Sequence, residues 1–302
     1  MGKENVVYIS SQDIQMLCGS ADGNDMIRIE SYESLPLNEG SMINGVITDE
    51  QDIKDNLEAL KEKGLNECYL VIDSGQILTK NVVVPFLNKK ELIQFCKDEL
   101  SSIDSSYTDV IYDYSVLNQK NEDGKTGEIL CCGVERKLIG SYIEIFESAG
   151  VKLKAVDISI NAVIKLTQEL PELENKTYVI AIMDGNNVSS FLFENNRYVF
   201  SNRSRLFSER GTDAFNIEMS GNISQLIQFN KSQHSEHAIE TAYFCGLQAD
   251  EEMLVYNRIE NSLNIKAERF PLSTTICVNK DKLKDDFTFH KFILPAGGLL
   301  RK

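Results

Sequence analysis

Residues 178–193 read YVIAIMDGNNVSSFLF and carry the clearest secondary-structure signal in the chain. An apolar, β-rich run reaches a turn at 184–187, Asp-Gly-Asn-Asn, and a second β run follows at once. Because glycine and asparagine tolerate positive φ, this pattern predicts a β-hairpin. The chain opens in the same way, with VVYI at 6–9, a polar turn at 10–13 and IQML at 14–17. Two hairpins that each begin one half of the chain predict a duplicated α/β fold with a cleft between its halves.

The composition excludes several classes of function. The 302 residues are 42% hydrophobic and 25% charged, as in ordinary globular proteins, and suffice for one large domain or two. The net charge of −15 argues against nucleic-acid binding and disfavours adsorption to anionic lipid. No apolar run approaches the roughly 20 residues that span a bilayer. We therefore expect a soluble protein without a membrane span of its own.

The cysteines and histidines point to a reduced, metal-free protein. Seven cysteines are scattered without a CxxC pair, and no signal peptide follows Met1, which is typical of a cytosolic chain. Three histidines are too few for a convincing metal site. His234 and His237 lie three residues apart, but no acidic partner with ligand geometry is evident near them. We therefore expect a cytoplasmic protein with no bound metal.

The first part of the chain alternates hairpin strands with a covering helix. Residues 5–33 predict a three-strand meander. The next helix begins at Thr48, which is expected to form a capping box with Gln51, and it ends at Gly64. A buried strand with CYLVI at its centre follows at 67–73. This order is typical of an α/β layer.

Residues 76–135 predict a small α+β subdomain inserted into the first half. Asn88 is expected to begin its helix, with Glu91 as the second member of a capping box. Strands are expected at 77–84, 109–117 and 129–134, with a polar loop at 118–128. A helix ended by Gly150, a strand and a further helix then complete the first half.

The second half begins with the hairpin at 178–193. Further strands are expected at 197–204, 240–245 and 267–270, and helices at 213–232 and 249–263. Basic charge gathers in this acidic protein at Arg197, Arg203, Arg205 and Arg210. The simpler interpretation is a solvated face, and the alternative is a contact for an acidic neighbouring subunit.

Several short motifs follow one another in a characteristic order. They are GVITD at 45–49, VPFLNKKEL at 84–92, VIYDYSVL at 110–117, Tyr142 with Ala149-Gly150-Val151 and Asp157, ISQLIQFNKSQ at 223–233, and Gly298-Leu299-Leu300-Arg301. Each motif is weak alone, but together they resemble the type IV pilus assembly protein PilM family. That family belongs to the actin-like ATPases and is related to the cell-division protein FtsA. Arg203 also fits an arginine that follows the second hairpin in the family.

The resemblance implies an actin-like fold of two RNase H-like halves with an inserted α+β subdomain. The first half would comprise residues 1–75 and 136–176, the inserted subdomain 76–135, and the second half 177–302. The resemblance also implies a cytoplasmic scaffold or adaptor of a type IV pilus or related secretion machine, peripheral to the inner face of the cell membrane. Such an adaptor grips a short cytoplasmic peptide of its membrane partner, PilN, in a groove by the inserted subdomain, through strand pairing or apolar contacts. An exposed strand edge of the subdomain is a further candidate for homo-oligomer formation.

Nucleotide binding in this family depends on three elements, and the sequence departs from each. In the first hairpin, an Asp-x-Gly turn and a later lysine meet the phosphates and Mg²⁺. The corresponding residues here are Tyr8, Ser10 and Gln15, with Ser11 beside them. A hard cation needs carboxylate oxygens, and phosphate needs backbone N–H groups that approach closely, hence glycine. Asp13 is nearby, but an aspartate there is typical of an ordinary turn.

The second and third elements also differ from the family pattern in ways that disfavour nucleotide binding. If the second hairpin is aligned on Gly185, Met183 stands where the family has an acid. Asp184 is adjacent, and because neighbouring strand residues point to opposite faces, it would reach the cleft only if the turn shifts by one residue. In the third element of the family, adenosine lies flat against the backbone of a Gly-Gly pair. Here Gly246 is followed by Leu247, whose Cβ obstructs that approach.

These departures predict a degenerate nucleotide cleft. Its residues are Ser10, Ser11, Gln15, Asp184, Gly185, Asn186 and Gly246. No catalytic residue or cofactor is expected, and binding of ATP and Mg²⁺ is doubted. The alternative is a PilM-like ATPase that uses Asp184. A different RNase H-like enzyme, such as a sugar kinase or a nuclease, would need several acids on adjacent strand ends, and the sequence shows no such cluster.

Overall fold

The computed structural model of the chain describes residues 2–21, 26–103, 108–120, 124–233, 235–279, 283 and 287–300. Three features of the sequence analysis lie outside them: His234, Arg301 and the middle of the polar loop at 118–128.

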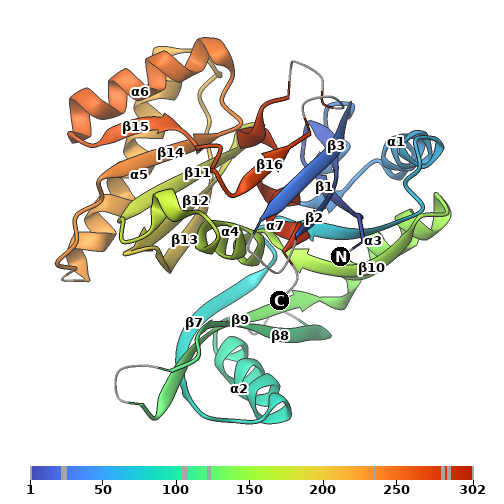
Figure 1. The fold of residues 1–302 in the computed structure, drawn as a ribbon, viewed down its shortest axis with the longest axis horizontal. Helices are drawn as coiled ribbons and strands as arrows, with labels where there is room; N and C mark the ends of the chain where they lie inside the picture. Colours follow the sequence, from blue (N-terminus) through green and yellow to red (C-terminus); the bar gives the residue numbers. More distant parts are fainter. Residues whose placement is uncertain are drawn as a thin grey trace.

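Two mixed β-sheets form the body of the molecule, and they repeat one strand order (Figure 1). The first contains β1 (Glu4–Ile9), β2 (Asp13–Ala21), β3 (Ile27–Pro36), β6 (Glu67–Ile72) and β10 (Lys152–Ile158). The second contains β11 (Tyr178–Asp184), β12 (Asn187–Glu194), β13 (Arg197–Arg205), β14 (Thr241–Cys245) and β15 (Lys266–Arg269). In each sheet an antiparallel meander is extended by two parallel strands, so β3-β2-β1-β6-β10 corresponds to β13-β12-β11-β14-β15. The duplication predicted from the two hairpins is confirmed.

Helices cover both sheets and fill the space between them (Figure 1). On the outer faces lie α1 (Glu50–Glu62) and α3 (Arg136–Ser148) for the first sheet, and α5 (Asp213–Ser232) and α6 (Ala249–Leu263) for the second. Between the sheets lie α4 (Ser159–Gln168) and α7 (Ile293–Leu299). Strand β11 is buried on both faces, which explains why its sequence is a nearly continuous apolar run. Short 3-10 turns occur at Pro171–Leu173 and Phe289–Lys291.

The end of the chain returns to the first sheet. Strand β16 (Ile276–Val278) pairs in parallel with β3, and α7 packs against α4 and β1. A Cβ on Gly298 would lie 2.6 Å from Val6 and 2.8 Å from Val71, so only glycine permits this approach. Residues 177–302 were expected to belong entirely to the second half, but β16 and α7 pack on the first sheet. A three-residue strand carries no periodicity that sequence patterns can detect.

The inserted subdomain is a three-stranded sheet with one helix. Its strands are β7 (Leu78–Pro85), β8 (Val110–Asn118) and β9 (Thr126–Glu135), in the order β7-β9-β8, and α2 (Lys89–Ser101) packs on them. The capping box of α2 is confirmed. Asn88 accepts the N–H of Glu91 at 3.2 Å, and the Glu91 carboxylate accepts the N–H of Asn88 at 2.9 Å. Both β7 and β8 are edge strands of this sheet.

Two local expectations in the first half need correction. The N-cap of α1 is Asp49, which accepts the N–H groups of Gln51 and Asp52 at 3.1 and 3.2 Å, so the capping box expected at Thr48 is wrong. The Thr48 hydroxyl donates instead to the Gly40 carbonyl. The second correction is a small hairpin of β4 (Met42–Ile43) and β5 (Val46–Ile47), whose Asn-Gly turn has φ of 51° and 76°. Asn-Gly is the preferred sequence for such a turn, but this hairpin was not among the predicted elements.

Candidate functional site

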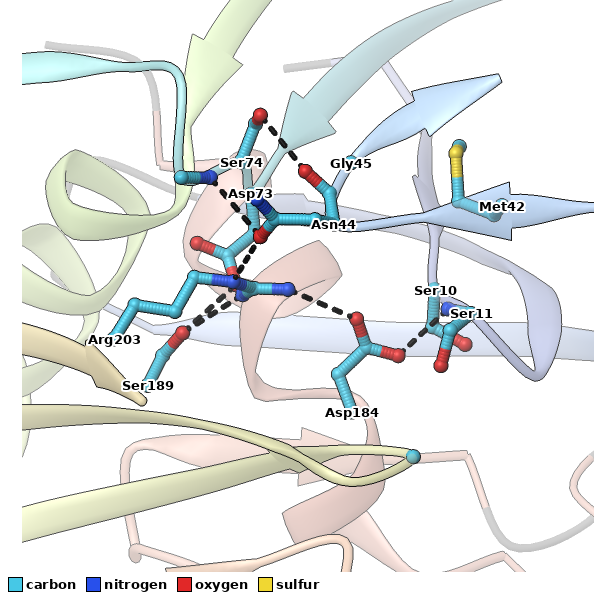
Figure 2. A network of polar contacts seen from close by, with 12 residues as sticks. Ser10, Ser11, Met42, Asn44, Gly45, Asp73, Ser74, Asp184, Ser189 and Arg203 are labelled. Carbon is cyan, nitrogen blue, oxygen red and sulfur yellow. Dashed lines mark hydrogen bonds and ion pairs between the residues drawn. The ribbon is translucent and has the colours of Figure 1, made fainter. Parts of the chain in front are cut away.

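The turns of the two large hairpins meet between the halves of the molecule (Figure 2). The carboxylate of Asp184, at the end of β11, accepts the backbone N–H of Ser11 at 2.6 Å. Gly185 is equally close, since a Cβ there would lie 2.7 Å from the Ser11 hydroxyl oxygen. Its positive φ of 57° closes the turn. The structure therefore brings together three of the residues expected at the cleft.

Asp184 points toward the first half, whereas Met183 lies on the opposite face of β11 and also lines the cavity described below. Along β11, Ile180 and Ile182 belong to the core between the sheets, whereas Met183 belongs to the core under α5 and α6. Strand residues alternate in direction, so Asp184 points toward the first half without any shift of the turn. The expectation that it points away is wrong. Aligning the hairpin on its glycine gave the wrong register by one residue.

Arg203, on β13, lies at the centre of a polar network that joins the two halves (Figure 2). Its guanidinium forms ion pairs with Asp73, which follows β6, and with Asp184, to which Nη2 donates at 3.3 Å. Nε donates to Asn44 Oδ1 at 2.9 Å, and Nη1 donates to Ser189 Oγ at 2.9 Å. The side chains of this Asp73–Arg203–Asp184 triad are 11%, 14% and 6% exposed. The network, named here the arginine clasp, is thus largely buried.

The partners of the clasp are themselves held in place. The Asp73 carboxylate accepts the hydroxyls of Ser159 at 2.7 Å and Ser189 at 2.9 Å. The Ser74 hydroxyl donates to the carbonyl of Asn44, at the tip of the β4–β5 hairpin, at 2.9 Å. Each of these contacts restrains Asp73 or Asn44, the two residues of the first half that Arg203 binds.

Charges at the clasp affect the ionisation of nearby groups. Burial alone would lower the pKa of Arg203, but the carboxylates of Asp73 and Asp184 outweigh it and raise that pKa. Burial, with smaller contributions from the same two carboxylates, raises the pKa of the Tyr8 hydroxyl well above its ordinary value. Arg203 is therefore a permanent cation here, and Tyr8 stays neutral.

The interpretation of the four arginines as a solvated face is wrong for two of them. Arg203 belongs to the clasp, and Arg210 forms an ion pair with Glu251, whose side chain is 1% exposed. Arg210 also donates to the carbonyls of Gly185 and Gly246 at 3.1 Å each. Burial alone would raise the pKa of Glu251, but hydrogen bonds from Arg210 and from a backbone N–H outweigh it and lower that pKa. Arg197 and Arg205 are exposed, as expected.

A cavity of about 300 Å³ lies beside the first hairpin, and Ser10, Gln15 and Gly246 line it. Ser10 donates to Asp13 at 2.6 Å, and the amide nitrogen of Gln15 donates to the same carboxylate at 3.3 Å. The side-chain oxygen of Gln15 is buried and has no hydrogen-bond partner. Asn186 does not line this cavity; its carbonyl accepts the N–H of Leu206 at 2.7 Å.

Neighbouring residues restrict the backbone conformation of Gly246. Its φ is +79°, and a Cβ there would lie 2.9 Å from the carbonyl oxygen of Met183. His290, from the end of the chain, accepts the Gly246 N–H through Nδ1 at 3.4 Å. Burial first, and then the charge of Arg269, lowers the pKa of His290 to about 4. His290 is therefore neutral at pH 7, consistent with its acceptor role.

Sequence reasoning did not single out Asp73, Asn44 or His290. Asp73 carried one usable signal, because an acid directly after a buried strand lies at the carboxyl edge of the sheet. No cluster of acids is evident in the sequence, yet the fold brings Asp73 and Asp184 to one guanidinium. In the described part of the chain, no group of three or more His, Cys, Asp and Glu side chains is arranged to hold a metal ion.

A second, larger hollow of about 850 Å³ separates the inserted subdomain from the first half. We call it the subdomain groove. One wall is formed by β8 and β9, and the other by β10 and α4; the lining residues include Ser115, Val116, Cys132, Ala155, Ile158 and Asn161. Both β8 and β10 are edge strands, so each can present unpaired backbone groups to the groove. On the floor, Lys165 pairs with Asp157 at 2.6 Å, and Asn161 donates to Asp157 at 2.8 Å.

Comparisons with known proteins agree with this architecture. The family described as type IV pilus assembly protein PilM matches residues 7–218. Among solved structures, one titled as a PilM-PilN type IV pilus biogenesis complex has a TM-score of 0.78 at 14% identity, over 98% of this chain and 96% of that chain. A Bacteroides thetaiotaomicron protein of actin-like ATPase fold has a TM-score of 0.53 at 9% identity, over 99% and 96%. The cytoplasmic domain of EpsL, from the Vibrio cholerae type II secretion system, has a TM-score of 0.52 at 10% identity, over 100% and 96%.

These likenesses show that the fold is of the actin-like type, as expected from the sequence. A search among curated protein sequences gives no match. In the part of the chain that the structure describes, no helix is both long enough and apolar enough to cross a membrane.

Proposed function

Because this chain belongs to the type IV pilus assembly protein PilM family, we propose that it is a cytoplasmic adaptor of a pilus or related secretion machine. In this proposal it lies at the inner face of the cell membrane, where it holds a short peptide of a PilN-like membrane protein. The solved structure with the highest similarity score described above is titled as a complex of two such proteins, which supports this choice of partner.

The subdomain groove is the observation that carries the proposal. An extended peptide laid between β8 and β10 can add a strand to either sheet edge, and backbone hydrogen bonds then supply affinity without demanding a particular sequence. The register of β10 shifts at Lys154, between Leu153 and Ala155, which interrupts regular pairing on the side away from the groove. Residues 155–158 are therefore the part of the β10 edge that is best placed to pair.

The lining of the groove indicates what such a peptide presents. Val116 and Ile158 offer apolar contacts to alternate side chains of an extended segment. Asp157, Asn161 and Lys165 supply charged and amide groups at one place on the floor. We propose that an apolar peptide segment with one polar side chain, directed at this floor, is the ligand of the groove.

A binding experiment tests the adaptor function. A fluorescently labelled peptide of the cytoplasmic segment of the PilN-like protein from the same cell is titrated with the chain, and anisotropy gives the Kd. Ala155 is exposed and lines the groove, so Ala155→Trp should weaken binding at least about tenfold, or about 1.4 kcal/mol. Ala249→Trp, also at an exposed alanine but on α6, is the matched control and should change the Kd less than about twofold. No saturable binding, or equal effects of the two variants, would contradict the proposal.

We further propose that the cleft between the hairpins is degenerate as a nucleotide site and that the adaptor works without ATP or Mg²⁺. Mg²⁺ requires carboxylate oxygens, but the carboxylates of Asp73 and Asp184 are already bound to the Arg203 guanidinium, whose charge offsets part of their attraction for a second cation. Phosphate and adenosine require free backbone at glycines, but Gly246, which lines the cavity, is followed by Leu247 rather than by a second glycine. The residues present therefore do not suit a magnesium-bound nucleotide.

One observation favours the alternative, a PilM-like ATPase that uses Asp184. This carboxylate faces the cleft and lies at the tip of its hairpin, beside Ser11. If it holds the metal of a bound nucleotide, Mg-ATP binds the unaltered chain in calorimetry, and Asp184→Ala abolishes that binding. Absence of binding to the unaltered chain, or the same affinity in the variant, rejects the ATPase.

A further inference from the structure

We infer that Arg203 is a positioning residue for the subdomain groove: the arginine clasp fixes the spacing of the two groove walls without any nucleotide. The chain's own side chains connect the two halves at this place. The expected change in peptide affinity rests on the proposed adaptor function. The effect of Arg203 on the groove walls can be measured without a peptide.

The first step is that the clasp spans the two halves. Asp73 and Asn44 come from the first half, and Asp184 and Ser189 from the second. Arg203 donates to all four, from three different nitrogen atoms. A planar guanidinium that bonds in several fixed directions restrains both distance and orientation, which a single ammonium group cannot do.

The second step leads from the clasp to one groove wall. Asp73 accepts the hydroxyl of Ser159, the 2%-exposed first residue of α4. Asn161, two residues further in the same helical turn, lines the groove and donates to Asp157 on β10. Ile72, directly before Asp73, also lines the groove. The Asp73 carboxylate is therefore one restraint on the α4 and β10 wall, beside the β6–β10 pairing and the packing of α4 on α7.

The third step leads from the same strand to the opposite wall. The side-chain amide of Asn81, on β7 of the inserted subdomain, donates to the carbonyl of Val199 on β13 at 3.1 Å. Val199 lies four residues before Arg203 on that strand. Strand β13 thus holds the subdomain through Asn81 and the α4 wall through Arg203. Loss of the Arg203 contact would remove one restraint on the start of α4 while the contact of Asn81 with β13 stays in place.

Arg210 provides a matched control within the same chain. Its side chain is 14% exposed, as is that of Arg203, and it also forms a buried ion pair. However, its partners Gly185, Gly246 and Glu251 all belong to the second half. Removing Arg210 therefore breaks a comparable pair without breaking a connection between the halves or to the groove.

The experiment compares Arg203→Gln with Arg210→Gln in the full chain, by hydrogen exchange with mass-spectrometric detection and by affinity for the labelled PilN-like peptide. We expect Arg203→Gln to accelerate exchange at least about fivefold in 159–168 and to weaken the peptide Kd about tenfold, whereas Arg210→Gln changes both less than about twofold there. Arg203→Lys should restore only part of either effect, because it restores the charge but not the planar fork.

Two outcomes would overturn the inference: unchanged exchange in 159–168 for a folded Arg203→Gln, or the same acceleration in both glutamine variants. If Arg203→Gln does not fold, Ser159→Ala replaces it. That variant keeps every charge of the clasp and removes only its bond to α4, and it should accelerate exchange in the first turn of α4; no change there is equally contradictory. If the unaltered chain fails to bind the peptide, the adaptor proposal is wrong, while the exchange comparison still decides the role of Arg203.

Discussion

Replacing Arg203 by methionine tests the energetic account of the clasp most directly. Methionine keeps much of the side-chain volume but leaves Asp73 and Asp184, whose side chains are 11% and 6% exposed, without their common cation. Breaking a buried ion pair from one side typically costs about 3–5 kcal/mol, because an uncompensated charge remains in a poorly solvated site. Hydroxyls still reach Asp73 and a backbone N–H still reaches Asp184, so we expect the lower end, about 3 kcal/mol.

The assay is urea unfolding at pH 7, followed by circular dichroism, with the midpoint and slope fitted for each variant. The informative comparison is the triple variant Asp73→Asn, Asp184→Asn, Arg203→Met. Replacing a buried ionic group completely is often close to neutral, so the triple variant should lose under about 2 kcal/mol and be more stable than Arg203→Met alone. Non-additivity of this kind is expected only for groups in direct contact. A loss below about 1 kcal/mol for Arg203→Met, or a triple variant less stable than the single one, would refute the reasoning.

Three further predictions concern the cleft. Mg-ATP at millimolar concentration should leave the melting temperature unchanged in scanning fluorimetry. If the chain bound Mg-ATP and the ligand were present at 100 times its Kd, the folded state would gain about 2.7 kcal/mol and the melting temperature would rise by several degrees. Gly246→Ala should lower the free energy of unfolding by about 1–3 kcal/mol in urea titrations, because its φ is +79° and its Cβ would lie 2.9 Å from Met183, and wild-type stability would count against that contact. Since the folded-state pKa of His290, about 4, lies below its ordinary value of 6.5, the unfolded chain takes up the proton first and stability falls as pH drops from about 6.5 toward 4. The shift in the pKa of His290 corresponds to a loss of roughly 3 kcal/mol in the free energy of unfolding, which partial solvent screening reduces to about 2 kcal/mol. His290→Gln should remove this pH dependence. Parallel pH profiles for the two proteins would contradict the assignment of the pH dependence to His290.

Much of the fold could be predicted from the sequence because the relevant signals are local. The bounds of α5 and α6 match the predicted helices at 213–232 and 249–263, since helical periodicity and terminal residues act within a few turns. The hairpin at 178–193 follows in the same way from its turn residues. What could not be predicted depends on distant pairing: β16 joins β3 across most of the chain, and Arg203 meets Asp73 130 residues away.

The candidate site was also predicted only in part, and the predicted direction of one side chain was wrong. Its residues were found by aligning short motifs, and the fold does bring Ser11, Asp184 and Gly185 into contact. The direction of Asp184 was nevertheless wrong, because the alternation of β11 is set by the cores on its two faces and not by the position of the turn glycine. A shift of one residue in an alignment reverses every such conclusion.

This reversal changes the argument for a degenerate cleft. From the sequence, the cleft lacked an acid, and loss of nucleotide binding would follow from an absent ligand. In the structure an acid is present and directed toward the first half, but together with Asp73 it is bound to Arg203. An acid bound to a guanidinium differs physically from a missing one, since the same guanidinium also bonds the two halves to each other. These contacts let the chain keep its groove-forming arrangement without a bound nucleotide, which agrees with the proposed adaptor function.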